Sequence, residues 1–392
     1  MGLFSKKEKS SDELFQDGLH AYNAQKYKKA LDCWTKAAEK GDVTAANNIG
    51  VLYANGLGVA RDEAKASSWF EKAAQQGYAN AQYYLAARYA DGRGVAKDSA
   101  KAAFWYEKAA QQGHEKAQQA LAQMKEAART EDAKAALNEA MKFLQKKDYA
   151  SALPLLEKAA QQGNASAQYN LALCYHSGDG VEMDEAKAAY WFEQAAQQGH
   201  TNAQSNLGIC YFNGKGVEKD EAKAVQWYEK AAQQGHVNAQ LMLGICYANG
   251  RGVTKDISKA EEWLEKAAKQ GSETAQKTLA QLKASIKAQA LKLLEDGITF
   301  AQKEDYAHAF PLFEQAAKLG DARAQFLLGG CYDNGEGVTM DKAKAAHWYE
   351  QAARQGHADA QFCLGYSYDY GEGVTEDKVK ASYWYEQAAQ QG

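Results

Sequence analysis

The sequence predicts an all-α protein, a solenoid of stacked antiparallel helix pairs, and three observations support this fold class. The 392 residues include 33 glycines but only 2 prolines, which disfavours turn-dense β-sandwiches, collagen and proline-rich linkers. Glycines recur at a fixed interval, as at Gly41, Gly77 and Gly113. The residues between them follow the helical period of about 3.6, and such helices need neighbouring repeats to bury their apolar sides.

Ten repeats end on a glycine of this series. Seven are complete, because each carries a Gly-x-Gly-Val segment, an aspartate and a tryptophan before its closing glycine. The three repeats that end at Gly41, Gly163 and Gly320 lack the Gly-x-Gly segment, so the array starts there and restarts twice. The closing glycines are Gly41, Gly77, Gly113, Gly163, Gly199, Gly235, Gly271, Gly320, Gly356 and Gly392. The aspartates are Asp62, Asp98, Asp184, Asp220, Asp256, Asp341 and Asp377.

Each complete repeat predicts the same elements in order. The first helix, helix A, has an apolar side that includes Ala81, Leu85 and Tyr89. A glycine loop follows, and then a second helix, helix B, in which Ala102, Trp105, Tyr106 and Ala109 share one side. The aspartate before helix B is suited to accept the unpaired N–H groups of its first turn. The closing glycine is suited to the left-handed position just past its end.

Long connector helices are expected at the two restarts. Residues 114–147 and 272–296 contain no glycine or proline, and both segments begin like helix A. We expect each connector to end one block of repeats and to lead into the next. The predicted parts are a flexible tail, 1–10, and three blocks, 11–128, 129–285 and 286–392. Pro154 and Pro311 are expected in the first turn of a helix B, where a missing N–H is harmless, unless that helix begins at Asp148 and the proline kinks it.

Other recurring residues predict structural roles. One position of helix A is a cysteine in four repeats, at Cys174, Cys210, Cys246 and Cys331. Equivalent positions of stacked repeats lie about 10 Å apart, which is too far for a disulfide bond. We therefore expect buried thiols and a reducing compartment. The recurring tryptophans are expected to pack against the next repeat. A lysine three residues after each aspartate opposes the helix dipole, so we expect a specific acceptor such as a loop carbonyl. These lysines are Lys65, Lys101, Lys187, Lys223, Lys259, Lys344 and Lys380.

The chain resembles the Sel-1-like repeat family, relatives of the tetratricopeptide repeats. Its pattern, A-x-x-x-L-G-x-x-Y-x-x-G-x-G-V-x-x-D-x-x-K-A-x-x-W-Y-x-x-A-A-x-x-G, is closely matched by residues 203–235 and recurs through nearly the whole chain. The resemblance implies a right-handed superhelix of helix pairs with helix A on the concave side. It also implies a scaffold or adaptor role and no chemistry.

The sequence favours a protein that is not an enzyme and holds no cofactor or metal. Gly-x-Gly lies between helices and lacks the strand and third glycine of a dinucleotide site, and its variable middle residue is typical of a solvated tip. The loops around Glu336 and Glu372 miss the spacing of a calcium site. His114, His200, His236 and His357 lie a repeat or more apart, so they do not converge on a metal. No motif supports the distant alternative, a hydrolase of the penicillin-related kind named for some relatives.

A protein or peptide partner is expected on the side of helix A opposite its core residues. Positions on this helix-A face vary between repeats, and several are large and apolar where solvent is expected. The alternative is that these side chains only pack against neighbouring helices. The candidate partner-binding residues are Asn47, Tyr83, Tyr169, His176, Phe212, Leu241, Phe326, Phe362 and Tyr366.

The charge of the chain limits the classes of partner that we expect, and the two ends of the chain bear on its compartment and its self-association. The net charge of −4 without a basic cluster argues against nucleic acid, and no apolar run is long enough to span a membrane. Basic and acidic residues number 18 and 15 in 1–128, 18 and 19 in 129–285, and 10 and 16 in 286–392, so a basic partner could favour the last block. No signal peptide is recognised, so a cytoplasmic location is expected, with translocation or surface display as the alternative. The last repeat lacks a polar cap, which indicates a shortened chain or self-association.

Overall fold

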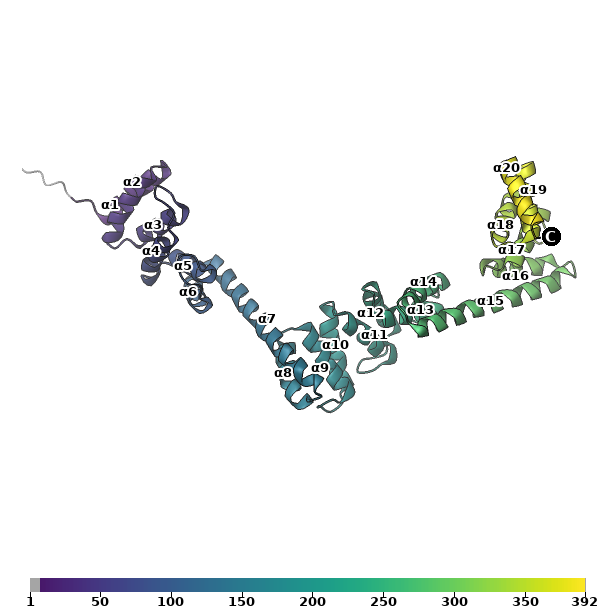
Figure 1. Cartoon of the computed structure of the whole chain (residues 1–392), viewed down its shortest axis with the longest axis horizontal. Helices are drawn as coiled ribbons and strands as arrows, with labels where there is room; N and C mark the ends of the chain where they lie inside the picture. The colour runs from purple at the N-terminus through teal and green to yellow at the C-terminus, as the bar shows by residue number, and fades with distance from the viewer. Residues whose placement is uncertain (1–7, 392) are drawn as a thin grey trace, which may run out of the picture. The chain divides into compact units, whose positions relative to one another are not determined.

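The computed structural model describes residues 8–391, and within them it contains 20 helices and no strand (Figure 1). The chain forms two compact units, Met1–Glu182 and Met183–Gly392. The first contains α1 (Ser11–Asn23), α2 (Tyr27–Glu39), α3 (Val43–Asn55), α4 (Glu63–Gln75), α5 (Ala79–Asp91), α6 (Ser99–Gln111), α7 (Glu115–Gln145), α8 (Tyr149–Gln161) and α9 (Ala165–Ser177).

The second compact unit continues the same alternation. It contains α10 (Glu185–Gln197), α11 (Thr201–Asn213), α12 (Glu221–Gln233), α13 (Val237–Asn249), α14 (Ile257–Lys269), α15 (Glu273–Ala301), α16 (Tyr306–Lys318), α17 (Ala322–Asn334), α18 (Lys342–Arg354), α19 (Ala358–Tyr370) and α20 (Lys378–Ala389). Inside each compact unit, adjacent helices pack in pairs and each helix B also packs against the next helix A. The predicted all-α array of stacked helix pairs is confirmed.

The predicted signals set the ends of the helices. Asp98 Oδ1 accepts the backbone N–H of Lys101 at 2.9 Å, and the other six aspartates of this column cap their helices in the same way. The first glycine of each Gly-x-Gly segment ends helix A in the left-handed conformation, as Gly92 does with φ +76°. The closing glycines that lie within residues 8–391 are also left-handed; Gly113 has φ +81°.

The four histidines after closing glycines are helix caps. His114, His200, His236 and His357 each begin a helix A, where the ring Nδ1 accepts a backbone N–H three residues later at 3.1–3.4 Å. Asn164 and Asp321 do the same with side-chain oxygens. Because Nδ1 must be unprotonated to accept, the cap requires a neutral ring. Burial lowers the pKa of both His200 and His236, which favours that neutral form.

The two restarts are formed by single long helices, as the glycine-free segments predict. α7 has 31 residues and α15 has 29. Each begins where a helix A is due and ends packed against the next helix B, α8 or α16. The division into three blocks at these helices stays a prediction.

The expectation that Pro154 and Pro311 lie in the first turn of a helix B is wrong. α8 begins after the capping residue Asp148 and α16 after Asp305, so Pro154 and Pro311 are each the sixth residue of their helix. A proline there removes one hydrogen bond to the carbonyl four residues earlier. Both helices nevertheless continue to their usual length of 13 residues, since the packed alanines and leucines that follow hold the later turns.

The core consists of alanines and single large side chains. In one cluster Ala86, Ala102, Ala109 and Ala117 surround Tyr106. Glycine on helix A lets the aromatic ring of helix B approach the backbone: a Cβ at Gly208 would lie 2.5 Å from a ring carbon of Tyr228. The recurring tryptophans are half-buried, and those for which the packing is described lie against such clusters, as expected: Trp69, Trp105, Trp263, Trp348 and Trp384.

The lysine column finds a different acceptor from the expected carbonyl. Lys65 Nζ lies 3.4 Å from Oδ2 of Asp62, the residue that caps its own helix, and 5.6 Å from the ring centroid of Tyr53. The other lysines of the column pair with their capping aspartates at 3.3–4.0 Å. The carboxylate, together with a tyrosine face where one is in reach, offsets the unfavourable helix dipole.

The cysteines behave as small apolar residues. Cys174, Cys210, Cys246 and Cys331 are buried and unpaired, as expected, and Cys33 is buried as well. Burial raises the pKa of Cys174, Cys210 and Cys246 to about 11 and that of Cys331 to about 12. Thiols of this kind are poor nucleophiles and poor metal ligands at neutral pH.

Candidate protein-binding surface

The nine candidate partner-binding residues differ in exposure. Phe362 and Tyr366, both on α19, are exposed by 57% and 43%. Five others are half-buried: Tyr83, Tyr169, His176, Leu241 and Phe326. Asn47 and Phe212 are buried, with 5% and 9% of their surface exposed. The helix-A face is therefore most open at α19.

The structure corrects the expectation for Asn47 and Phe212, because neither side chain is available to a partner. The ring of Phe212 is covered by the guanidinium of Arg251, which lies 4.0 Å from the ring centroid, and it packs 6.3 Å from the ring of Tyr228. Arg251 belongs to the next glycine loop, so the burial depends on a contact between repeats. Asn47 lies within α3, and its amide nitrogen donates to Oδ1 of Asn48 at 3.3 Å.

Two of the half-buried aromatics are held between successive repeats. Tyr83 stacks on the ring of His114 with centroids 4.7 Å apart and lies 5.8 Å from Tyr106. Phe326 repeats this arrangement with His357 at 4.8 Å and Tyr349 at 6.0 Å. Each ring therefore packs between its own helix B and the histidine that caps the next helix A. Part of each ring is left for a partner.

Phe362 occupies the equivalent position on α19. Its ring lies 5.5 Å from that of Tyr385 on α20, as expected for this position. Four and eight residues later, Tyr366 and Tyr370 follow on the same side of α19, with ring centroids 4.5 Å apart. Tyr370 is 62% exposed. Phe362 and Tyr385 also line a cavity of about 560 Å³ with Asp359 and alanines of both helices. This aromatic stripe contains the two candidate residues that are exposed, Phe362 and Tyr366.

The Gly-x-Gly loops have a structural role that their variable middle residue does not reveal. In each complete repeat the second glycine packs against the first residue of the preceding helix B, which we call the loop-contact residue. A Cβ at Gly94 would lie 2.0 Å from the carbonyl oxygen of Glu63. The loop-contact residues are Tyr27, Glu63, Tyr149, Glu185, Glu221, Tyr306 and Lys342.

In three of the four repeats in which both residues are charged, the middle residue of the loop pairs with the loop-contact residue; in the fourth, Arg93 pairs with Asp91 instead. Lys215 Nζ lies 3.7 Å from Glu185, and Arg251 lies 2.5 Å from Glu221. In a later repeat both charges are reversed, and Glu372 lies 3.0 Å from Lys342 Nζ. In these three repeats the charge of the middle residue is complementary to that of its partner thirty residues earlier, so the tip of the loop also contributes to the contact between repeats.

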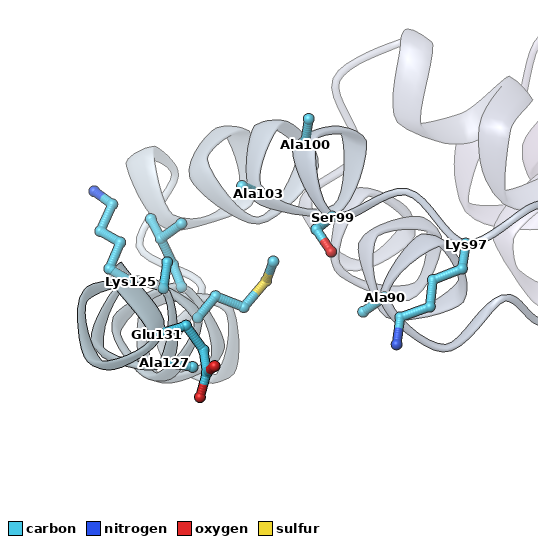
Figure 2. Close-up of a pocket in the computed structure, with 11 residues that line it drawn as sticks. Ala90, Lys97, Ser99, Ala100, Ala103, Lys125, Ala127 and Glu131 are labelled. Carbon is cyan, nitrogen blue, oxygen red and sulfur yellow. The ribbon is translucent and has the colours of Figure 1, made fainter. Parts of the chain in front are cut away.

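Three helices B have no glycine loop against their first residue within residues 8–391: α6 at Ser99, α14 at Ile257 and α20 at Lys378. At Ser99 the connector α7 continues where the loop would turn. An apolar groove of about 610 Å³ remains between α6 and α7. Figure 2 shows Ser99, Ala100 and Ala103 of α6 on one side, with Lys125, Ala127 and Glu131 of α7 on the other. The groove marks where the regular stacking stops.

The described residues offer no arrangement for metal chemistry. No group of three or more histidine, cysteine, aspartate or glutamate side chains in residues 8–391 is placed to hold a metal ion. Among the helices that the structure describes, none combines the length and apolarity needed to cross a membrane.

The Sel1 repeat family model matches ten segments: residues 13–42, 43–78, 79–114, 138–164, 165–200, 201–236, 237–272, 280–321, 322–357 and 358–392. Similar solved structures include a protective antigen of uropathogenic Escherichia coli strains that displays an SLR fold, with 32% identity over 97% of this chain and 76% of that chain and a TM-score of 0.37. A Sel1 repeat protein from Oxalobacter formigenes has 28% identity over 97% and 84%, with a TM-score of 0.27. Helicobacter pylori cysteine-rich protein B has 32% identity over 32% and 94%, with a TM-score of 0.28. No curated protein matches at a significant level.

Proposed function

Because the chain belongs to the Sel1 repeat family, we propose that it is a non-enzymatic scaffold or adaptor that binds protein partners through its helix-A face. Sel1 repeat proteins are typically protein-interaction scaffolds. The observation that carries the proposal is the stripe of Phe362, Tyr366 and Tyr370, three exposed aromatic residues on one side of α19. Large rigid aromatic side chains dominate binding energy at protein interfaces.

The test is a pull-down from the source cells with a triple variant, Phe362→Ala, Tyr366→Ala and Tyr370→Ala. A matched control changes Phe104, Tyr190 and Tyr383 to Ala, because these are exposed aromatics of helices B. Helical circular dichroism establishes that both variants fold. We expect the first variant to lose a partner that wild type and control retain. Retention of every partner by the folded first variant would show that the aromatic stripe is not the binding surface.

The same stripe supports self-association as an alternative. Ala352 and Ala353 of α18 are buried under the next helix A, whereas the equivalent residues Ala388 and Ala389 of α20 line the open cavity beside Phe362. A second copy would cover this apolar surface. Light scattering that reports a monomer at high protein concentration would remove this alternative.

We also propose that the protein acts in a reducing, cytoplasmic compartment, on the basis of its unpaired buried thiols. The alternative is export by a route that needs no cleavable signal. Cell fractionation with markers for each compartment separates the two, because export predicts the protein in the medium or at the cell surface.

A further inference from the structure

A second, polar site lies on the helix-A face of the first compact unit. α3, α4 and α5 surround a pocket of about 350 Å³ that is lined by three arginines, Arg61, Arg88 and Arg93, and by one carboxylate, Glu63. Val51, Ala54 and Asn55 of α3, together with Phe70 and Tyr84, complete the lining. Of these residues Tyr84 is 41% exposed, and the centroid of its ring lies 5.0 Å from that of Phe70.

Arg88 is an unusual residue for its position. It occupies the helix-A column that holds cysteine in four other repeats and leucine at Leu52, and only 8% of its surface is exposed. Its Nη1 donates to Glu63, and its guanidinium carbon lies 5.0 Å from the ring centroid of Phe70. Nε and Nη2 donate to no atom within residues 8–391. A buried cation with unused donors beside a pocket is suited to an anionic ligand.

At this pocket the carboxylates that pair with the three arginines leave one positive charge unbalanced. Glu63 accepts from both Arg88 and Arg61, and these two arginines hold its pKa below the usual range. Arg93 is held by Asp91, which does not line the pocket. Three guanidiniums thus face two carboxylates. One further carboxylate would balance the charge, whereas a phosphate monoester would bring about 1.5 to 2 negative charges.

We propose that this pocket binds an acidic side chain, glutamate or aspartate, of a protein partner. Guanidinium groups bind carboxylates through paired, charge-assisted hydrogen bonds, and Tyr84 supplies an apolar surface for the adjoining peptide. The inference rests on the proposed protein-binding function but not on the aromatic stripe of α19. The two can therefore fail separately.

The probe is a fluorescein-labelled hexaglutamate, measured by fluorescence polarisation at low salt against the full chain. Hexaglutamine of the same length is the neutral control, and a hexapeptide with one phosphoserine among glutamines tests the phosphate source. We expect binding of hexaglutamate that weakens with salt and no binding of hexaglutamine. Tighter binding of the phosphoserine peptide would overturn the assignment to a carboxylate.

The two variants are Arg88→Leu and Arg93→Gln. Leucine is chosen at residue 88 because α3 has a leucine, Leu52, at the equivalent position. The matched control is Arg251→Gln, because Arg251 is also the middle residue of a Gly-Arg-Gly loop but lies in the second compact unit. We expect at least a tenfold loss of hexaglutamate affinity for the first two variants and less than a twofold change for the control. Equal losses in all three, or none in Arg88→Leu and Arg93→Gln, would show that the pocket is not the site.

Discussion

Lys342 at the start of α18 forms an ion pair with Glu372 in the following glycine loop, with Nζ and Oε2 3.0 Å apart. Glu221 and Arg251 form the equivalent pair two complete repeats earlier, but there the acidic residue begins the helix and the basic residue lies in the loop. Both pairs join consecutive repeats beside a glycine that packs on the backbone of the preceding helix. Complementary charge at these two positions is thus part of how one repeat fits the next.

Reversing one charge of this pair should destabilise the stack, and reversing both should restore part of the loss. Glu372→Lys places two cations together, and we expect a cost of about 0.5 kcal/mol because more than a third of each side chain is exposed to solvent. Adding Lys342→Glu restores the attraction but leaves the new glutamate near Asp333, which pairs with Lys342 at 2.8 Å. Urea unfolding of the two single variants and the double variant gives the coupling. A coupling free energy between residues 342 and 372 that is zero or unfavourable would contradict a stabilising ion pair.

The histidine caps should make stability depend on pH. The pKa of His200 and of His236 is lowered in the folded chain by burial, so the unfolded chain binds protons more readily. The stability from both caps is complete above the unfolded pKa of about 6.5 and is lost as the pH falls through the lower folded pKa. Changing both to Asn, the residue that caps α9, should reduce this loss by about 1 kcal/mol per helix.

Thermal unfolding between pH 7.5 and pH 5 checks this prediction. His347→Asn is the control, because His347 is an exposed residue within α18 and caps no helix. We expect the control to follow wild type and the double variant to have a flatter profile below pH 6.5. A double variant as sensitive to acid as wild type would mean that other groups cause the dependence.

The sequence predicts best those structural features that depend only on residues close together along the chain. Asp98 and Gly113 act as a cap and a stop within their own helix, so the residue pattern alone identifies them. The periodicity of α11 predicts Phe212 on the open face because it takes no account of Arg251, which reaches the ring from the next loop. The arginine pocket combines residues from three helices and from the glycine loops that follow α3 and α5. Its sequence signal was a charged residue, Arg88, in a column of small apolar ones.

The buried thiols should react slowly in the folded protein. Burial raises the pKa of Cys174 to about 11, so at pH 8 its thiolate is rarer by more than two orders of magnitude than that of an ordinary cysteine of pKa about 8.5. Titration with a chromogenic disulfide reagent should show little rapid reaction before denaturation and six thiols afterwards. Fewer than six thiols in the denatured, unreduced protein would reveal disulfides and contradict the reducing compartment.

The contact between glycine loop and helix should matter more for stability than the left-handed backbone itself. Gly94 and Gly113 both have positive φ, +68° and +81°, so alanine at either position pays about 1 kcal/mol of backbone strain. A Cβ at Gly113 meets nothing within 4 Å, whereas one at Gly94 meets the Glu63 carbonyl oxygen at 2.0 Å. The loop must then move away from α4, which disturbs the Arg88–Glu63 pair.

Gly94→Ala should therefore cost about 2 kcal/mol more than Gly113→Ala in urea unfolding, since overpacking of a close contact adds to the strain. The same comparison tests the arginine pocket indirectly, because Arg93 precedes Gly94 and would be carried away with the loop. Hexaglutamate affinity should fall with Gly94→Ala and stay unchanged with Gly113→Ala. Equal costs of unfolding for the two variants would show that the loop contact contributes nothing beyond its backbone conformation.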